Sequence, residues 1–254
     1  MKLHIVVNPK YSYLTDFVYS IPAHFDSGGE ILNDDRNVIK RFHVNGLAVV
    51  VKRYKRPNWV QRISYSFFRK GKAERAYLYG NELLNRGFST PESIAYIEHY
   101  TNHLLDYSYY LCLNDSSPAI RQEIKDVEEP NLVVLEDFAI FVCELHKRGI
   151  LHHDLNCSNV LYKAANNGHY TFSLIDNNRM FFYPDHTMPP LDECLMNLTR
   201  FTDDMRIFHI VAEDYCKTRN LGNEVVDRLI SIKTKRDIKW HRKKALLRKL
   251  KLKR

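Results

Sequence analysis

Cysteine is scarce in this sequence of 254 residues. The five cysteines are odd in number, and no two have the C-x-x-C spacing of a structural zinc site. They are Cys112, Cys143, Cys157, Cys194 and Cys216. A zinc-binding module and a secreted disulfide framework are therefore disfavoured, and a reducing cytosol fits best.

Long apolar runs are also missing. No stretch of about 18 uncharged apolar residues occurs, the length that a membrane-spanning helix needs. The apolar run near the N-terminus is too short for the core of a signal peptide. A content of 44% hydrophobic and 27% charged residues is ordinary for a folded protein. We therefore expect one globular protein of two lobes or two small domains.

Acidic residues are nearly absent from the C-terminal end. Residues 233–254 contain twelve Lys and Arg and one acid, Asp237, so their net charge is +11. Residues 1–232 carry 26 basic and 29 acidic side chains, a net charge of −3. The overall charge of +8, which would indicate an anionic partner, therefore belongs to a basic tail on a near-neutral body.

The first half of the chain has a β pattern with one main helix. We expect β structure over residues 20–54, where Asn45-Gly46 forms a tight turn because both residues tolerate positive φ. The strands predicted in this half are 38–44, 47–52, 94–97 and 107–113. A helix is expected over residues 72–85, followed by Gly87 as its stop.

The second half is mostly helical. Residues 114–118 are a linker by composition, and one apolar helical face follows it, ending at Gly149. That face comprises Leu135, Phe138, Ala139, Val142 and Leu145. We expect a loop over 151–159, strands over 160–163 and 170–175, and helices over 191–232. The pattern predicts an α+β protein with a β-rich N-terminal lobe (1–113), a short, mostly α C-terminal lobe (114–232) and a basic amphipathic tail (233–254).

Four side chains have the chemistry that phosphoryl transfer from ATP requires. Asp154, in the segment His-His-Asp-Leu-Asn-Cys-Ser-Asn, suits a carboxylate that orients an acceptor hydroxyl and takes its proton. Asn159 and Asp176 offer the hard oxygen ligands that Mg²⁺ prefers. Lys52 follows an apolar strand and suits a cation that steadies the phosphates.

These residues carry a resemblance to a known family. The spacing H-x-D-x-x-x-x-N, a strand pair and then an Asp resemble the catalytic core of the protein-kinase-like fold, and Val-Val-Val-Lys52 is similar to its phosphate-binding strand. The lipopolysaccharide core kinases, which phosphorylate Kdo or heptose, are the closer resemblance. The segments 51–57, 72–77 with 87–96, and 194–201 carry it, and it covers roughly residues 25–210.

The sequence departs from protein-phosphorylating members of that superfamily. His153 stands where their catalytic loop usually has Arg, and Asn156 stands where Ser/Thr protein kinases have Lys. Asp176-Asn177-Asn178 replaces D-F-G, and no A-P-E motif follows. A sugar acceptor therefore fits better than a protein acceptor.

Two parts of the expected nucleotide site are less distinct. The helix carboxylate that should pair with Lys52 is Glu74 or Glu82, and we favour Glu74. Gly28-Gly29 is the only glycine pair in the region where a phosphate-covering loop is expected, and it is a weaker signal than G-x-G-x-x-G. His152 is interpreted as a packing residue of the loop rather than a metal ligand.

The resemblance implies an ATP- and Mg²⁺-dependent phosphotransferase that acts on a lipid-linked saccharide, Kdo first and heptose second. Two alternatives stay open: a protein or small-metabolite kinase of the same fold, and a kinase-like binding module without activity. The expected location is the cytoplasm, peripheral on the inner face of the membrane.

The basic tail has three possible roles. Trp240, Leu247 and Leu250 share one helical face among basic residues, which is typical of a helix lying on anionic lipid. Binding to nucleic acid and a merely solvated helix end are the other interpretations. We expect an anionic membrane surface as the partner and no nucleic acid.

Overall fold

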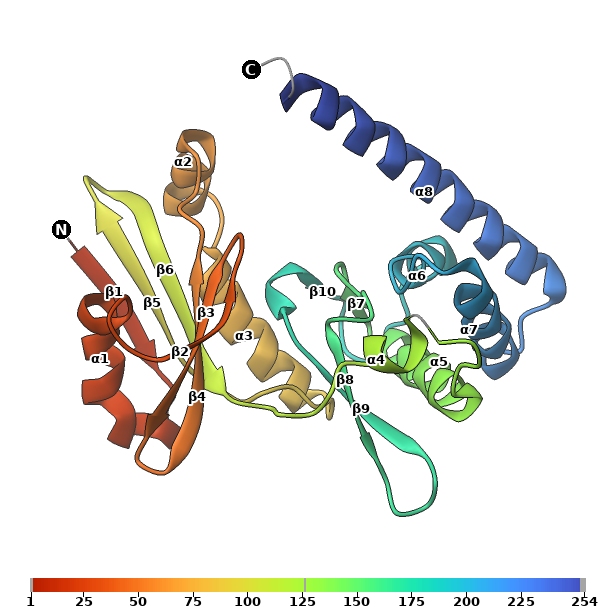
Figure 1. The fold of residues 1–254 in the computed structure, drawn as a ribbon, viewed down its shortest axis with the longest axis horizontal. Coiled ribbons are helices and arrows are strands. Elements are labelled where there is room, and N and C mark those ends of the chain that lie inside the picture. The colour runs from red at the N-terminus through yellow and green to blue at the C-terminus, as the bar shows by residue number, and fades with distance from the viewer. Residues whose placement is uncertain (1, 126, 252–254) are drawn as a thin grey trace. The chain divides into compact units, whose positions relative to one another are not determined.

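The computed structural model describes residues 2–125 and 127–251, with side chains up to residue 246 (Figure 1). The chain divides into two compact units. The first comprises Met1–Ser116 and Leu174–Arg179, and the second comprises Ser117–Ser173 and Met180–Arg254. The segment 174–179 thus belongs to the first unit, although the sequence boundaries placed it in the second lobe.

The first unit is built on a six-stranded antiparallel sheet with the strand order β1-β5-β6-β4-β3-β2. Its strands are β1 (Lys2–Val7), β2 (Glu30–Asp34), β3 (Val38–Val44), β4 (Leu47–Tyr54), β5 (Ser93–Thr101) and β6 (Leu104–Leu113). The predicted turn at Asn45 and Gly46 is present, since both residues have positive φ. It joins β3 to β4 in the predicted register, with Val44 opposite Leu47.

The two faces of this sheet carry different side chains, because successive residues of a strand point to opposite faces. Val49 and Val51 of β4 pack into a core cluster with Val18, Ile21 and Phe25 from the α1 region. Tyr54, which shares its face with Lys52, packs instead against Ala73 and Tyr77 of α3, as part of a second cluster. In Figure 1, α1 and α3 accordingly lie on opposite sides of the sheet.

The helices of the first unit are α1 (Thr15–His24), α2 (Trp59–Phe67) and α3 (Lys72–Asn85), preceded by a short 3₁₀ helix η1 (Pro9–Leu14). The predicted helix over 72–85 is confirmed. The β assignment of residues 20–24 was wrong: they complete α1 even though Pro22 lies within it. The burial of Val18 and Ile21 offsets the hydrogen bond that proline removes.

The second unit carries most of the other helices. They are α4 (Arg121–Ile124), α5 (Leu132–Lys147), α6 (Leu191–Leu198), α7 (Met205–Thr218) and α8 (Asn223–Lys251). Two strand pairs join them, β7 (Ile150–His152) with β10 (Met180–Phe182), and β8 (Val160–Ala164) with β9 (Tyr170–Leu174), and a 3₁₀ turn, η2 (Asn177–Arg179), precedes β10. The apolar face predicted for α5 is fully buried, and Gly149 follows the helix with a φ of +70°.

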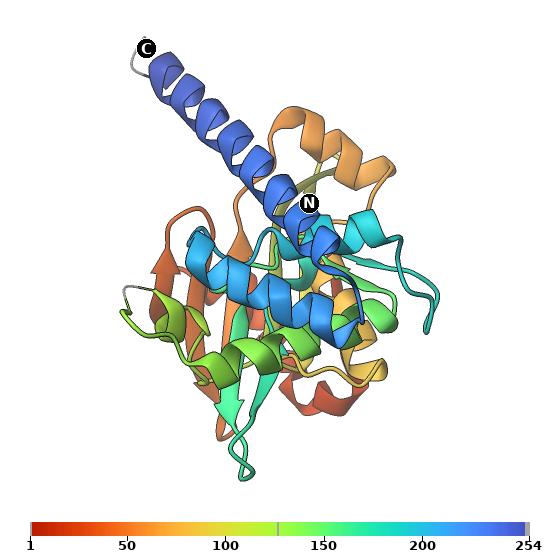
Figure 2. The same ribbon diagram turned by 90° about the vertical axis from the view of Figure 1, so that its right-hand side faces the viewer.

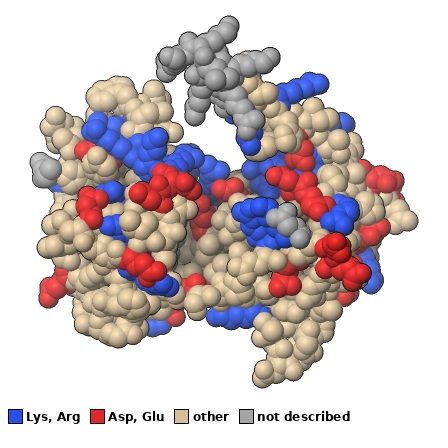
Figure 3. All heavy atoms as spheres, in the orientation of Figure 1, with Lys and Arg blue, Asp and Glu red and all other residues tan. Residues whose placement is uncertain are grey.

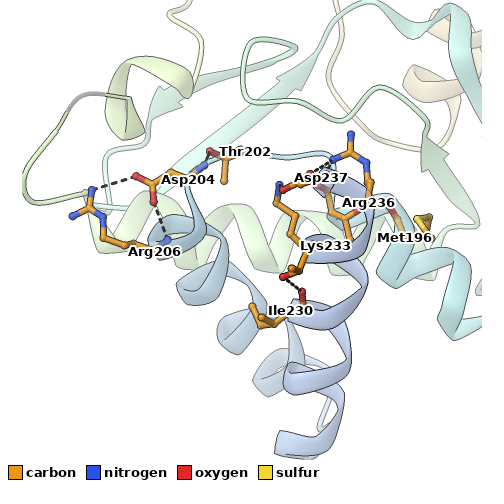
Figure 4. Close-up of polar contacts among 10 residues, drawn as sticks. Met196, Thr202, Asp204, Arg206, Ile230, Lys233, Arg236 and Asp237 are labelled. Atoms are coloured by element: carbon orange, nitrogen blue, oxygen red, sulfur yellow. Dashed lines mark hydrogen bonds and ion pairs between the residues drawn. The ribbon is translucent and has the colours of Figure 1, made fainter. Parts of the chain in front are cut away.

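Helix α8 runs without a break through the expected boundary at residue 233. Its first half packs on α6 and α7, and Figure 2 shows its C-terminal part extending away from them. Lys233 is completely buried, with its Nζ 2.5 Å from a carboxylate oxygen of Asp237 (Figure 4). Arg236 donates to the backbone oxygen of Thr199, 3.0 Å away. The first basic residues of the tail therefore fasten the helix to the body.

Residues 238–246 of α8 are exposed. Ile238, Trp240 and Leu246 are each about half exposed. They lie on different sides of the helix, because successive residues are 100° apart. The side chains of Leu247 and Leu250, which the predicted apolar face includes, lie outside the described residues. In the described ranges, no helix combines the length and the apolar character needed to cross a membrane.

Candidate functional site

Lys52 lies in β4, on the face of the sheet that α3 covers. Its Nζ is 2.6 Å from Oδ1 of Asp176 and 5.2 Å from the centre of the Tyr54 ring. The Lys52 side chain is only 14% exposed. The register places Lys52 opposite Ile39, beside the turn of residues 35–37 that joins β2 to β3. The sequence prediction that Lys52 and Asp176 belong to one site agrees with this contact.

Asp176 follows β9 directly and has a φ of +60°, a conformation that non-glycine residues adopt uncommonly and that is often found at functional sites. Asn178 donates to the same Oδ1 atom of Asp176 at 2.5 Å. The next side chain, Asn177, is buried and donates to Oγ1 of Thr90. Thr90 in turn donates to the backbone oxygen of Leu174, 2.7 Å away. Polar contacts to the segment after α3 thus hold the backbone on both sides of Asp176.

Several further cations surround this ion pair. Lys72 opens α3, and its Nζ lies 6.0 Å from the centre of the same Tyr54 ring. Burial and then the charges of Arg36, Arg179 and other cations lower the pKa of Lys72 to about 8. Arg36 is in the turn between β2 and β3, and Arg179 ends η2. None of these three residues was predicted as a site residue, although Lys72 stands at the start of the helix predicted over 72–85.

Neither predicted helix carboxylate pairs with Lys52. Glu74 is 2.7 Å from Nζ of Lys70, and Glu82 is 2.7 Å from Nε of Arg86. The partners in both pairs are four residues apart at the two ends of α3, so local geometry satisfies these carboxylates. In this structure Lys52 contacts Asp176, and a role of Glu74 at the nucleotide site stays a prediction.

The glycine pair does not form a loop beside Lys52. Gly28 and Gly29 precede β2 and pack against Phe42, which is on the α1 face of the sheet. A Cβ atom at Gly29 would lie 2.7 Å from the Phe42 ring, and its φ is +75°. This packing accounts for the glycines and places them on the face opposite Lys52, so it gives no support to the predicted phosphate-binding role, which stays a prediction. The turn beside Lys52 is residues 35–37, which contains no glycine.

Asp154 and Asn159 belong to the second unit, in the turn after β7. The amide nitrogen of Asn159 donates to the backbone oxygen of Asp154 at 2.9 Å. This contact turns the Oδ1 atom of Asn159, the atom that binds metals, away from Asp154. His152 is fully buried, and its Nδ1 accepts from the backbone N–H of Asp154. The interpretation of His152 as a packing residue is confirmed.

A chain of buried hydrogen bonds supports this turn from below. Asn197 of α6 donates to the backbone oxygen of His152 at 2.7 Å, and its Oδ1 is 3.1 Å from Nε2 of His146. The Nδ1 of His146 is 2.7 Å from the hydroxyl of Tyr215, to which Arg219 donates. Donors and acceptors match along the whole chain only if His146 is neutral with its proton on Nε2. Burial lowers the pKa of His146 to about 4, which keeps it in that form.

His153, which stands at the position of the usual catalytic-loop arginine, is also neutral. Burial, and then the charge of Arg200, lowers the pKa of His153. Its ring stacks on Phe181 with centroids 6.3 Å apart. A neutral imidazole offers no fixed charge for a phosphorylated loop to bind.

A cleft of about 390 Å³ lies beside the turn in the second unit. Its lining comprises Arg121, Ile124, Lys125, Asn156, Cys157, Ser158, Arg200, Phe201, Thr202, Asp203 and Asp204. Asp204 accepts the backbone N–H of Arg206 and caps α7. The other charged residues of the lining are three basic ones, Arg121, Lys125 and Arg200, and one acidic one, Asp203. Burial raises the pKa of Cys157, which therefore contributes a neutral thiol.

The neutral state of His146 predicts a pH-dependent stability. An unfolded histidine takes up a proton near pH 6.5, whereas folded His146 does so only near pH 4. The free energy of unfolding should therefore fall as the pH drops from 6.5 to 4, by roughly 3 kcal/mol. We expect urea unfolding of His146→Gln to lack this share of the pH dependence.

The control for this experiment is His209→Gln, since His209 is half exposed and pairs only with Glu213 on α7. Its pH profile should follow that of the wild type. An NMR titration of the His146 ring provides a second readout that does not depend on a stable variant. A ring that titrates near pH 6.5 would contradict the assignment.

The comparisons with known proteins come from structure alone. No protein-family model matches the chain, and no curated protein matches it. A solved structure of WaaP in complex with acyl carrier protein is similar, with a TM-score of 0.62 and 15% sequence identity over 92% of this chain and 98% of that chain. The Rio2 kinase from Chaetomium thermophilum, solved as an ADP/Mg²⁺–phosphoaspartate complex, has a TM-score of 0.45 and 15% identity over 86% of this chain and 80% of that chain.

The likeness to WaaP spans nearly the whole of both chains. It agrees with the six-stranded sheet, the helix α3 and the helical second unit. The α+β architecture predicted from the sequence is confirmed, and the chain has the protein-kinase-like fold.

Proposed function

We propose that this protein is an ATP-dependent phosphotransferase that phosphorylates an inner-core sugar of lipopolysaccharide, with Kdo as the first choice and heptose as the second. The observation that carries the proposal is the ion pair of 2.6 Å between Lys52 and Asp176. In this fold, a strand lysine and a carboxylate after the catalytic loop serve the phosphates and their metal ion.

The four residues from the sequence analysis keep their roles in the proposal. Lys52 contacts the phosphates of ATP, and Asp154 orients the acceptor hydroxyl and takes its proton as the new bond to phosphorus forms. Asp176 and Asn159 hold Mg²⁺, because a carboxylate and an amide oxygen are the donor types that this ion prefers. The bound ion would neutralise charge on the phosphates. Positioning and charge stabilisation thus supply most of the expected rate.

We propose that cations replace the missing glycine loop. Arg36 in the turn between β2 and β3, Arg179 of η2 and Lys52 of β4 all lie close enough to Lys72 for their charges to lower its pKa. A polyphosphate carries several negative charges, which a group of cations can hold without a close approach of the backbone. Burial and then these like charges lower the pKa of Lys72, and a bound anion would relieve the repulsion between the charges.

The acceptor proposal is supported by the cleft in the second unit, which residues 156–158 of the loop after Asp154 help to line. Arg121, Lys125 and Arg200 give this cleft a basic lining. Kdo carries a carboxylate, so a basic cleft favours it over a neutral heptose. A protein or small-metabolite kinase remains the alternative that uses the same core, and it would phosphorylate those substrates and ignore Kdo-lipid.

We propose that the protein is cytoplasmic and acts at a membrane surface. Residues 238–254 carry nine Lys and Arg and no acid. Among the described residues of α8 the exposed apolar side chains lie on different sides, and the basic residues support an electrostatic attraction of this helix to anionic lipid. On the face drawn in Figure 3, basic and acidic side chains of the body are interspersed. High salt should therefore weaken membrane association more than ATP binding.

The catalytic proposal predicts the behaviour of Asp154→Asn. Incubation of the wild type with ATP, Mg²⁺ and Kdo-lipid A should add one phosphate to the saccharide, as measured by mass spectrometry. The variant should lose at least about a hundredfold in rate, because general-base positioning contributes that much or more. Its thermal unfolding should stay close to that of the wild type.

The matched control is Asp227→Asn, which changes an exposed acid of the second unit on α8 that does not line the cleft. It should retain most of the activity. Undiminished product from Asp154→Asn would refute the assignment of the base, and phosphorylation of a protein in place of the saccharide would favour the alternative.

The proposed phosphate cluster predicts weaker binding of inorganic tripolyphosphate by Lys72→Met and by Arg36→Gln. A charge-assisted hydrogen bond contributes about 1.5–3 kcal/mol, and about 1.4 kcal/mol is a tenfold change. We therefore expect each variant to raise the dissociation constant about tenfold or more in isothermal titration calorimetry.

Lys70→Met is the control, because Lys70 lies two residues from Lys72 but pairs with Glu74. It should bind tripolyphosphate as the wild type does. Wild-type affinity in Lys72→Met and Arg36→Gln would remove these residues from the phosphate site and leave the role of Lys52 unaffected.

A further inference from the structure

Helix α2 of the first unit presents its apolar side chains to solvent. Val60 is 75% exposed, Trp59 and Phe67 are more than 60% exposed, and Phe68, just after the helix, is 83% exposed. Trp59, Val60, Ile63 and Phe67 fall within one sector of about 100° on a regular helix. We call these four residues and Phe68 the α2 stripe. No residue of α2 is buried.

The polar side of α2 faces the protein. Nε of Arg62 donates to the backbone oxygen of Leu105 at 2.9 Å, and its guanidinium lies 3.5 Å from Asp106. Oγ of Ser66 accepts the backbone N–H of Leu105 at 2.8 Å. The side chain of Arg62 is only 12% exposed. Polar contacts therefore fix the orientation of α2, and the apolar side remains outward.

This orientation is the reverse of that of an ordinary surface helix, whose apolar stripe faces the core. A contiguous exposed apolar surface is normally covered by a partner or a membrane. No helix or strand was predicted over residues 58–71, because their aromatic and β-branched residues follow neither the alternation of a strand nor the periodicity of a core helix.

The charge around the stripe has one sign. Residues 55–72 contain six Lys and Arg and no Asp or Glu. Lys55 and Arg56 precede the helix, and Arg69 and Lys70 follow it, all of them exposed. Aromatic and aliphatic side chains on one side with basic residues at both ends are typical of a helix that lies in the headgroup region of an anionic bilayer.

We propose that the α2 stripe inserts into the interface of an anionic lipid bilayer. This inference deepens the proposed function, on which it rests for the lipid-linked nature of the acceptor. It assigns to α2 an apolar contact with the bilayer, in addition to the electrostatic attraction proposed for the basic residues of α8.

The two tryptophans of the chain make the test direct, because Trp59 is in the stripe and Trp240 is in α8. In a Trp240→Phe variant, all of the tryptophan fluorescence comes from Trp59. Its fluorescence should shift to the blue and be quenched by brominated lipid when vesicles of phosphatidylcholine with about one third phosphatidylglycerol are added. Vesicles of phosphatidylcholine alone should give a weaker response.

Binding itself is measured by co-sedimentation of the full chain with the same vesicles. The double variant Phe67→Ser/Phe68→Ser should lower the partition coefficient about tenfold or more. The matched control is Tyr13→Ser/Tyr19→Ser, since these two aromatic residues are also more than half exposed but lie outside α2. It should bind as the wild type does.

Each other outcome overturns the inference. Wild-type binding by Phe67→Ser/Phe68→Ser, or an unshifted Trp59 on sedimenting vesicles, excludes insertion of α2. A response of Trp240 alone, measured in Trp59→Phe, assigns the membrane contact to α8. Absence of vesicle binding together with a dimer that the double variant abolishes would assign the stripe to a second copy of the chain.

A separate experiment tests the proposed function. Transfer of phosphate to Kdo-lipid A in detergent micelles tests the chemistry without a bilayer. A protein that inserts α2 but transfers no phosphate would refute the proposed function and leave this inference standing. A protein that transfers phosphate without inserting would do the opposite.

Discussion

The ion pair between Lys52 and Asp176 is the contact on which the organisation of the first unit's site depends. It joins a strand of the sheet to a segment 124 residues later in the chain. Both partners are poorly exposed, so the attraction is stronger than that of a surface pair. Asp176 reaches Lys52 because its backbone adopts a positive φ and Asn177 turns inward to Thr90. Lys72 lies against the same Tyr54 ring as Lys52, and we propose that a polyphosphate balances the charge of these cations.

The second unit uses a chain of hydrogen bonds for a similar purpose. The chain runs from the Arg219 cation through the neutral groups of Tyr215, His146 and Asn197 to the backbone of His152, and it fixes the turn that carries Asp154. A protonated His146 would donate to the Tyr215 hydroxyl and leave the O–H of Tyr215 without its acceptor, which is costly in a buried network. The low pKa of His146 is thus a condition for the shape of the turn, and it acts at a distance from the reacting groups.

Much of the fold was predictable because local patterns were unambiguous. The Asn45-Gly46 turn, the helix over 72–85 and the apolar face of α5 follow from turn chemistry and periodicity. Helix α1 was missed because burial outweighs Pro22, and α2 because its stripe faces outward. At the site, Lys52 and Asp176 were found from their sequence context. The direct contact of Lys52 with Asp176 and the packing of Gly28-Gly29 against Phe42 were not predicted. They depend on the alternation of side chains along β4 and on the position of the Phe42 ring, and neither is visible in a linear motif.

The central claim is that this fold binds a nucleotide with its metal at the named residues. Anomalous diffraction from crystals grown with Mn²⁺ and a non-hydrolysable ATP analogue tests it most directly. The account predicts manganese in contact with the carboxylate of Asp176 and with Oδ1 of Asn159, and phosphates against Lys52. Nucleotide bound away from Lys52, or crystals that take up neither ligand while Lys52 and Asp176 stay paired, would contradict it.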